Sequence, residues 1–345
     1  MTQKPAFICM KVSLILLFLQ LLQPAFSQYN FTQADALLQQ HQQQLGNNVV
    51  ALVYKNGKLV YQKEMGGFNS NTPARIASCS KWLTAALVMT FVEEGKLNLD
   101  DKVGKYLPIF DTYGKSYITV RQCLSHLSGI AADKPGLLSF IKISRYSTLE
   151  VEVNDFASKN EIEAKPGSAF RYSAVGLNIA GRILEVISKK PFDRLMTDRI
   201  FKPLGMKNSS FASEKAVNPS GGATSTAADY MNFLTMILNK GMFNGKRLLS
   251  EASIAEMQQS RTHGLSITYT PAAGEGFEYG YGEWVQEKDA AGNSTVVSSP
   301  GLFGTWPLVD MGRQYASIIF VKTLLNEQRK DVYLQLKQAF DAAMK

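Results

Sequence analysis

The sequence is poor in the residues from which metal centres, disulfide frameworks and histidine-dependent active sites are built. Its 345 residues include three histidines, His41, His126 and His263, and three cysteines. It contains no His-Glu-x-x-His, no Cys-x-x-Cys, no phosphate-binding glycine loop and no Gly-x-Ser-x-Gly turn. We therefore expect no metal and no other cofactor, and a fold other than the α/β-hydrolase fold. His126 is expected to be structural rather than catalytic.

Dense runs of basic residues are also missing, although the chain is basic overall. The formal net charge is +8, and lysine and arginine are spread along the sequence. Nucleic-acid interfaces gather these residues into patches. We therefore expect no nucleic-acid partner, and the oligomeric state stays open.

The most strongly apolar run, Val12 to Leu22, is too short to span a membrane. A short basic start precedes it, and Ala25-Phe26-Ser27 follows as a small-x-small cleavage site. Residues 1–27 are therefore predicted to be a secretory signal peptide, with an uncleaved membrane anchor as the weaker alternative. We expect the mature chain to be secreted, to a bacterial periplasm, with no stable membrane anchor.

Removal of that segment leaves two cysteines, Cys79 and Cys123. In an oxidising compartment they could form a disulfide. They could equally be small buried residues. The sequence leaves both alternatives open.

The order of the predicted elements is strands, then many helices, then strands, then a helix. Asn56-Gly57 between Val49–Tyr54 and Leu59–Gln62 is typical of a β-hairpin. Apolar spacing predicts helices over Phe31 to Leu45, Ser78 to Glu94, Val120 to Leu127, Tyr172 to Ser188 and Ala227 to Leu238. Strands are predicted over Tyr279–Val285, Thr295–Val297, Leu302–Val309 and Tyr315–Val321, followed by a C-terminal amphipathic helix.

These elements predict an α/β (α+β) fold in a single domain, residues 28–345. An antiparallel sheet would be assembled from both ends of the chain, about 28–75 and 265–345, with flanking helices. Residues 76–264 would form a mostly helical lobe, and the active site would lie in the cleft between. The irregular segment 133–165 is expected to be a loop over that pocket.

One tetrapeptide suggests catalysis without histidine. In Ser78-Cys79-Ser80-Lys81 a hydroxyl and an amine stand three residues apart at the start of an apolar helix, so they share one face. An apolar environment lowers the pKa of a lysine and allows it to act as a base. Ser139-Phe140-Ile141-Lys142 has the same spacing, but it falls in the irregular segment and lacks a helix to hold it.

Further segments accompany this tetrapeptide in a fixed order. They are Glu94 to Asp101, Tyr106-Leu107-Pro108, Ile118 to Gly129, Pro166 to Ser173, Pro203 to Met206 and Gly221 to Ala227. Together they resemble the serine β-lactamase and penicillin-binding-protein superfamily. The resemblance is closest to the class C β-lactamase-like branch, which includes family VIII carboxylesterases, and it extends over essentially the whole mature chain.

The resemblance implies a β-lactamase/transpeptidase-like fold and assigns roles to individual residues. It implies Ser78 as the nucleophile, with Lys81 and Tyr172 as its base partners. The backbone N–H groups of Ser78 and Leu302 would form the oxyanion hole. The third motif of the superfamily matches Ser299-Pro300-Gly301.

Two departures from the family pattern bear on the substrate. Ala174 stands where the Tyr-x-Asn motif has its asparagine, and Ser299 stands where Lys-Thr-Gly has its cation. β-Lactams and D-alanyl peptides carry a carboxylate that such a cation would bind, whereas an uncharged ester does not need it. We therefore expect a small-molecule acyl substrate and a carboxylesterase. A β-lactamase or D-alanyl peptidase is the alternative within the family, and a non-catalytic module that is acylated without turnover is the alternative outside it.

Overall fold

The computed structural model describes residues 29–132, 145–323 and 329–345. The predicted signal peptide, residues 1–27, lies outside the described residues, and so does the second Ser-x-x-Lys match, Ser139 to Lys142. The first part of the predicted loop 133–165, residues 133–144, lies outside them as well. For the described remainder the prediction of an irregular loop is wrong, since Leu149–Lys159 form a helix, α7. The lobe boundaries inferred from the sequence stay predictions.

The centre of the molecule is a seven-stranded antiparallel sheet in the order β2-β1-β13-β12-β11-β10-β9. Its strands are β1 (Val49–Lys55), β2 (Lys58–Met65), β9 (Glu278–Tyr279), β10 (Trp284–Lys288), β11 (Ser294–Ser298), β12 (Trp306–Asp310) and β13 (Tyr315–Val321). The first two strands and the last five come from opposite ends of the described chain. The predicted antiparallel sheet with flanking helices is therefore confirmed.

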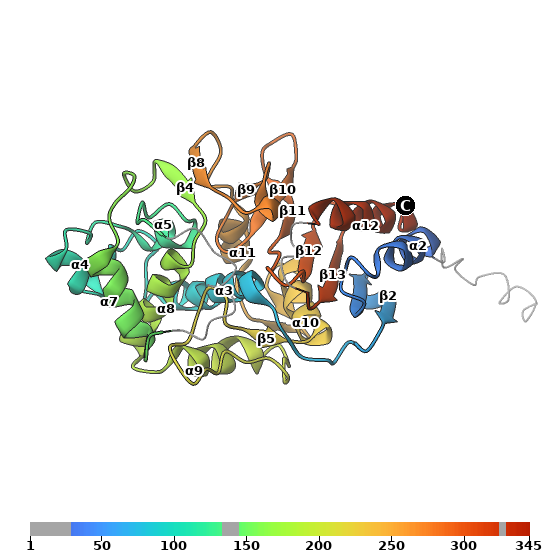
Figure 1. The fold of residues 1–345 in the computed structure, drawn as a ribbon, viewed down its shortest axis with the longest axis horizontal. Helices are drawn as coiled ribbons and strands as arrows, with labels where there is room; N and C mark the ends of the chain where they lie inside the picture. Colours follow the sequence, from blue (N-terminus) through green and yellow to red (C-terminus); the bar gives the residue numbers. More distant parts are fainter. Residues whose placement is uncertain (1–28, 133–144, 324–328) are drawn as a thin grey trace, which may run out of the picture.

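The side chains of β1 alternate between two cores, as the period of a strand requires. Val49, Ala51 and Val53 pack with α2 (Thr32–His41) and α12 (Lys330–Ala343). Val50 and Leu52 belong to the larger core, which also holds α3 (Ser80–Glu93) and α10 (Ala227–Leu238). Figure 1 shows α2 and α12 beside the sheet on one side.

Four of the remaining helices gather beyond α3, at the end of the molecule away from β2 (Figure 1). They are α4 (Ile109–Thr112), α5 (Val120–Leu124), α7 (Leu149–Lys159) and α8 (Val175–Ser188). Two others, α9 (Phe192–Met196) and α11 (Glu251–Gln258), pack against α3 itself. Short turns of helix lie at η1 (Ala77–Cys79), η2 (Val103–Lys105), η3 (Thr197–Phe201) and η4 (Ala272–Gly274). Small strand pairs join β3 (Ala74–Arg75) to β5 (Thr224–Ser225), β4 (Ala169–Arg171) to β8 (Ser266–Tyr269), and β6 (Met242–Phe243) to β7 (Lys246–Arg247).

The Asn-Gly hairpin is confirmed, whereas two later strands differ from expectation. Asn56 and Gly57 both have positive φ, 53° and 78°, which the tight turn between β1 and β2 requires. The predicted strand Tyr279–Val285 is two strands, because a turn interrupts it, with the Gly280 N–H donating to the Glu283 carbonyl. The predicted strand from Leu302 begins only at Trp306.

Two helices also begin later than predicted. Ser78 lies in the turn η1, and α3 begins at Ser80. Tyr172 precedes α8, which begins at Val175. Both candidate side chains therefore stand on the bends that lead into helices.

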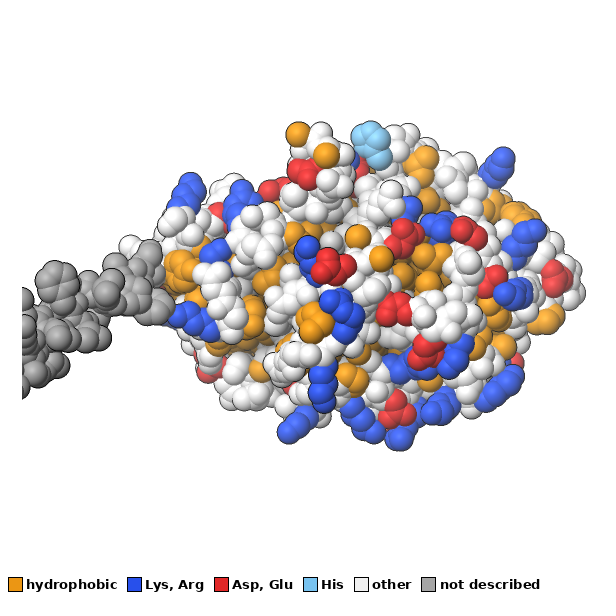
Figure 2. Space-filling model, turned by 180° about the vertical axis from the view of Figure 1, so that it is seen from behind, with side chains coloured by type: hydrophobic (Ala, Val, Ile, Leu, Met, Phe, Trp, Pro, Cys, Tyr) orange, Lys and Arg blue, Asp and Glu red, His pale blue; other side chains and the backbone are white. Residues whose placement is uncertain are grey.

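Cys79 and Cys123 are both buried and are not joined to each other, so the disulfide alternative is not realised in this structure. Burial raises the pKa of the Cys123 thiol to about 12. Within 29–132, 145–323 and 329–345, no helix combines the length and apolarity needed to cross a membrane. Figure 2 shows basic and acidic side chains side by side over much of the back of the molecule.

Candidate active site

Ser78 and Lys81 lie side by side where η1 passes into α3. The Lys81 ammonium nitrogen Nζ lies 3.3 Å from Ser78 Oγ. Every residue of α3 from Ser80 to Phe91 is buried, and Lys81 itself is 4% exposed. Ala77, just before the serine, adopts a left-handed φ of 45°, which is strained for a residue other than glycine. The sequence prediction that these two groups share a face therefore agrees with the geometry.

Lys81 also contacts a loop and an aromatic ring from elsewhere in the chain. Its Nζ donates to the carbonyl of Ser220, at 2.9 Å. It also lies 4.7 Å from the centre of the Tyr172 ring. The structure thus brings together Ser78, Lys81 and Tyr172, the three residues predicted for proton transfer. The sequence does not predict a role for Ser220, although this residue directly precedes the segment Gly221 to Ala227.

Tyr172 is held in place by backbone and ring contacts. It follows β4, and its N–H donates to the carbonyl of Tyr269 at the end of β8, at 3.1 Å. Its ring stacks on Trp284 of β10, with centroids 5.3 Å apart. The ring of His126 lies on it as well, 4.6 Å between centroids. These contacts fix the ring beside Lys81.

His126 supports this bend as a neutral imidazole. Its Nδ1 accepts from the Ser173 N–H at 3.4 Å, and its Nε2 lies 3.2 Å from Tyr279 Oη. Burial, and then the charge of Lys81, hold the pKa of His126 well below its usual value. Because Nδ1 accepts, the proton sits on Nε2 and is directed to Tyr279. The expectation of a structural histidine agrees with this arrangement.

The predicted third motif runs along the residues that precede Ser78. A Cβ added at Gly301 would lie 2.2 Å from the carbonyl of Ile76, so only glycine allows this approach. The Leu302 N–H has no acceptor among the described residues, as an oxyanion donor requires in the absence of substrate. Gly301 thus lies against the residues on either side of Ser78, and the role of Leu302 as an oxyanion donor stays a prediction.

Ser299 does not direct its side chain to a substrate. It is 2% exposed, and its hydroxyl donates to the carbonyl of Gly282 at 2.9 Å. Ala174 is exposed and precedes α8 without a side-chain cap. Neither position therefore offers a polar group to a bound molecule.

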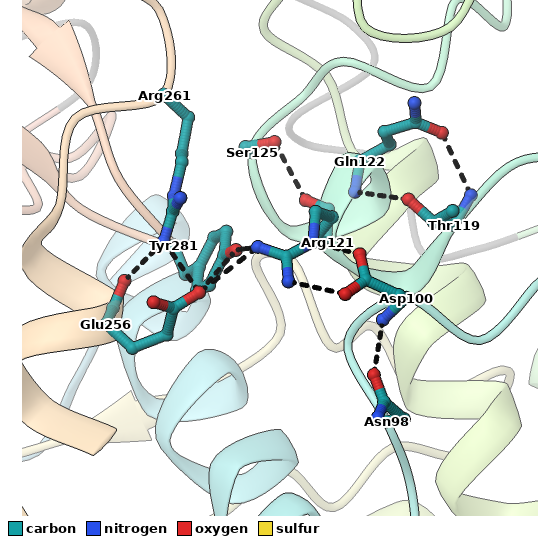
Figure 3. A network of polar contacts seen from close by, with 9 residues as sticks. All are labelled: Asn98, Asp100, Thr119, Arg121, Gln122, Ser125, Glu256, Arg261 and Tyr281. Atoms are coloured by element: carbon teal, nitrogen blue, oxygen red, sulfur yellow. Dashed lines mark hydrogen bonds and ion pairs between the residues drawn. The ribbon is translucent and has the colours of Figure 1, made fainter. Parts of the chain in front are cut away.

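A network of ion pairs anchors the turn between β9 and β10 to the helical side of the site (Figure 3). Arg121 of α5 donates to Tyr281 Oη at 2.9 Å and to Asp100 through two nitrogens, at 2.5 and 2.9 Å. It also pairs with Glu256 of α11 at 3.2 Å. Next to Tyr281, Gly282 packs on α3: an added Cβ would lie 2.5 Å from the Lys81 carbonyl. Arg121 falls within the segment Ile118 to Gly129, but the sequence does not connect it with these partners, because they are far apart along the chain.

The chain matches one family model and several known proteins. The beta-lactamase family model matches residues 34–340. Penicillin-binding protein 4 of Amycolatopsis lactamdurans is 30% identical over 240 residues, which cover 60% of this chain and 62% of that protein. The chain therefore spans less than two thirds of this relative's length.

Two solved structures are similar over nearly their whole length. A provisionally assigned beta-lactamase from Bacteroides dorei DSM 17855 is 27% identical, with a TM-score of 0.80 over 91% of this chain and 99% of that one. A family VIII carboxylesterase is 17% identical, with a TM-score of 0.73 over 91% and 97% of the two chains. The second likeness shows the fold alone.

Proposed function

Because the chain belongs to the beta-lactamase family, we propose that it is a serine hydrolase of the carboxylesterase type, which forms an acyl-enzyme on Ser78. The observation that carries the proposal is the contact between Lys81 Nζ and Ser78 Oγ, 3.3 Å apart and largely buried. A lysine in such a site can remove the serine proton without a histidine.

The proposed reaction has two acyl transfers. Ser78 Oγ attacks the ester carbonyl carbon while its proton passes to Lys81, with Tyr172 as the partner in the transfer. The negative oxygen is held by the N–H groups of Ser78 and Leu302. The bond to the alcohol oxygen then breaks, and that oxygen takes up the proton. Water attacks the acyl carbon in the second half, which releases the acid and restores the Ser78 hydroxyl.

The preference for an ester rests on Ser299 and Ala174. The Ser299 hydroxyl is engaged with Gly282 and carries no charge, so this position cannot pair with the carboxylate of a β-lactam or a D-alanyl peptide. Small uncharged acyl esters do not need that pair. The likeness to a family VIII carboxylesterase is consistent with this preference. Because the chain is also similar to penicillin-binding protein 4 of Amycolatopsis lactamdurans, a β-lactam must be tested beside the ester.

A comparison of substrates and variants tests the proposal. We expect the mature protein to turn over a short-chain nitrophenyl ester repeatedly and a chromogenic cephalosporin far more slowly. Ser78→Ala should abolish esterase activity. Ser139→Ala, in the second Ser-x-x-Lys match, should retain it.

Three results would contradict parts of this proposal. Full activity of Ser78→Ala would show that Ser78 is not the nucleophile. Faster cephalosporin turnover would reverse the substrate preference. A single burst followed by a stable adduct on Ser78 would indicate the acylated, non-catalytic module instead.

We further propose that the chain is secreted, on the basis of the signal-peptide pattern in residues 1–27. The intact mass of the protein recovered from a bacterial host tests this. A mass corresponding to a chain that begins directly after Ser27 supports export, and retention of the first 27 residues contradicts it.

A further inference from the structure

We infer that Asn178 is a positioning residue for Lys81 and acts through the backbone of Ser220. The inference rests on the proposed function, because it concerns the base that would activate Ser78. It concerns a residue that lies on α8, behind the loop that carries Ser220.

The backbone of Ser220 connects the two side chains. Its carbonyl accepts from Lys81 Nζ at 2.9 Å, and its N–H donates to Asn178 Oδ1 at 3.0 Å. Ser220 is 3% exposed and Asn178 is fully buried. Water therefore has little access to either bond, and their geometry is set by the protein.

The orientation of the Asn178 amide is fixed from its other end. Its Nδ2 donates to Glu152 Oε2 of α7, at 3.2 Å. A flipped amide would place its NH₂ group against the Ser220 N–H and its oxygen against the Glu152 carboxyl. Because both ends of the Asn178 amide are hydrogen-bonded in this orientation, the amide oxygen is the group that faces the Ser220 N–H.

Asn178 connects the loop that carries Ser220 to α8, whereas the second acceptor of the Ser220 N–H belongs to the loop itself. Asn218 Oδ1 also accepts from the Ser220 N–H, at 3.1 Å, but Asn218 belongs to the same loop and moves with it. Thr84 of α3 donates to the Pro219 carbonyl at 2.6 Å. Gly181 lets α8 approach, since an added Cβ there would lie 2.5 Å from Pro219. Asn178 thus fixes the loop to the helix that follows Tyr172.

The consequence is a fixed acceptor for the lysine. The Ser220 carbonyl holds Nζ within reach of Ser78 Oγ. Ala174, at the start of the same helix, has no polar side chain with which to contact Lys81 directly. The amide one turn further along α8 supplies this support through the main chain.

The test compares three changes in the full mature protein, with a short-chain nitrophenyl ester as substrate. Asn178→Leu removes both hydrogen bonds and should lower kcat about 10-fold with little change in KM, since the base but not the substrate is misplaced. Asn232→Leu is the control. It removes a half-buried amide bond from a different helix, to the Leu204 carbonyl at 3.0 Å, and should leave kcat and KM unchanged.

A double change separates positioning from packing. In Glu152→Gln with Asn178→Asp the amide and the carboxylate exchange places. The new carboxylate still accepts from Ser220 and from the new amide, so the pair should recover kcat to within about threefold of the parent, whereas Asn178→Leu does not.

Three outcomes would overturn the inference: Asn178→Leu with parental kcat, an equal loss of kcat in Asn232→Leu, or failure of the folded double variant to recover activity. If one of these outcomes occurs while Ser78→Ala is inactive, the positioning role of Asn178 is wrong and the proposed function stands. Full activity in Ser78→Ala would overturn the proposed function instead.

Discussion

At the scale of single residues, the candidate site is set by close backbone approach as much as by functional groups. Ala77, with its strained φ, directly precedes Ser78 within η1, and Gly301 allows the third segment to lie against Ile76. Ser299 uses its hydroxyl within the protein, and Ala174 has no polar side chain, so neither adds a polar group to the surroundings of Ser78.

Glu283 is a buried acid that the proposed reaction does not use. It is fully buried, and neither carboxyl oxygen has a hydrogen-bond partner among the described residues. Burial therefore holds the pKa of Glu283 well above its usual value, so the side chain is expected to be neutral in the folded protein.

Glu283→Gln should make stability less dependent on pH. In the unfolded chain the carboxyl ionises near its ordinary pKa, whereas the folded protein keeps the proton. Folding stability from this group is thus fully present below about pH 4 and is lost as the pH rises toward the folded pKa. Chemical denaturation at pH 5 and pH 8 should show a gain for Glu283→Gln that is larger at pH 8. The exposed Glu214→Gln is the control, and equal gains at the two pH values would contradict the prediction.

At the scale of elements, the turn between β9 and β10 connects the sheet to α3. Arg121 and Tyr281 hold it on one side, Trp284 stacks on Tyr172, and Gly282 packs on the carbonyl of Lys81. Displacement of this turn would therefore move both Tyr172 and the start of α3. The position of this turn therefore affects how Tyr172 and Lys81 lie relative to each other.

Gly282→Ala and Gly57→Ala form a matched pair that tests this role. Their φ angles are 76° and 78°, but an added Cβ at Gly57 meets nothing within 4 Å, whereas at Gly282 it lies 2.5 Å from a backbone oxygen. Gly57→Ala should lose about 1 kcal/mol through its backbone conformation and keep parental kcat. Gly282→Ala should lose about 1–3 kcal/mol more through overpacking and should also lose esterase activity. Equal denaturation midpoints and equal kcat would show that the contact with α3 is unimportant.

The elements themselves could largely be predicted from the sequence, whereas their ends and long-range contacts could not. Ala227 to Leu238 has a regular apolar period and matches α10 in full. The run from Tyr279 to Val285 contains strand-forming residues, yet it turns between Gly280 and Glu283, where Gly282 has a positive φ and packs on α3. Local propensity carries no information about that distant helix.

The same distinction applies to the candidate site. Ser78, Lys81 and Tyr172 could be found because each stands in a recognisable segment. Ser220 and Asn178 act through one backbone carbonyl and one buried amide, so their residue types alone gave no signal. The three-dimensional structure was needed to connect them.

At the scale of the whole molecule, one continuous core buries both Cys79 and Cys123. Cys79 and Cys123 are each 0% exposed and lie in the same cluster of buried side chains, together with residues of α3, α8 and α10. Opening one surface segment should therefore expose neither of them fully. Their reactivity should report on unfolding of the larger core.

Thiol labelling across a denaturant series should show this behaviour. Without denaturant, an aromatic disulfide reagent should modify neither thiol over hours, and both should become reactive at the midpoint seen by circular dichroism. The single variants Cys79→Ala and Cys123→Ala identify each thiol. A thiol that reacts well before the global midpoint would reveal a separate unfolding unit around it.

The pairing of β1 with β13 also bears on how the chain is made. Val49 lies opposite Val321, so β1 stays without one neighbour until residue 321 has been made and has left the ribosome. Contacts between such distant residues close a very large loop and form slowly. Until then the sheet cannot assemble, and the nascent β1–β2 hairpin presents an unpaired edge on which a chaperone could act.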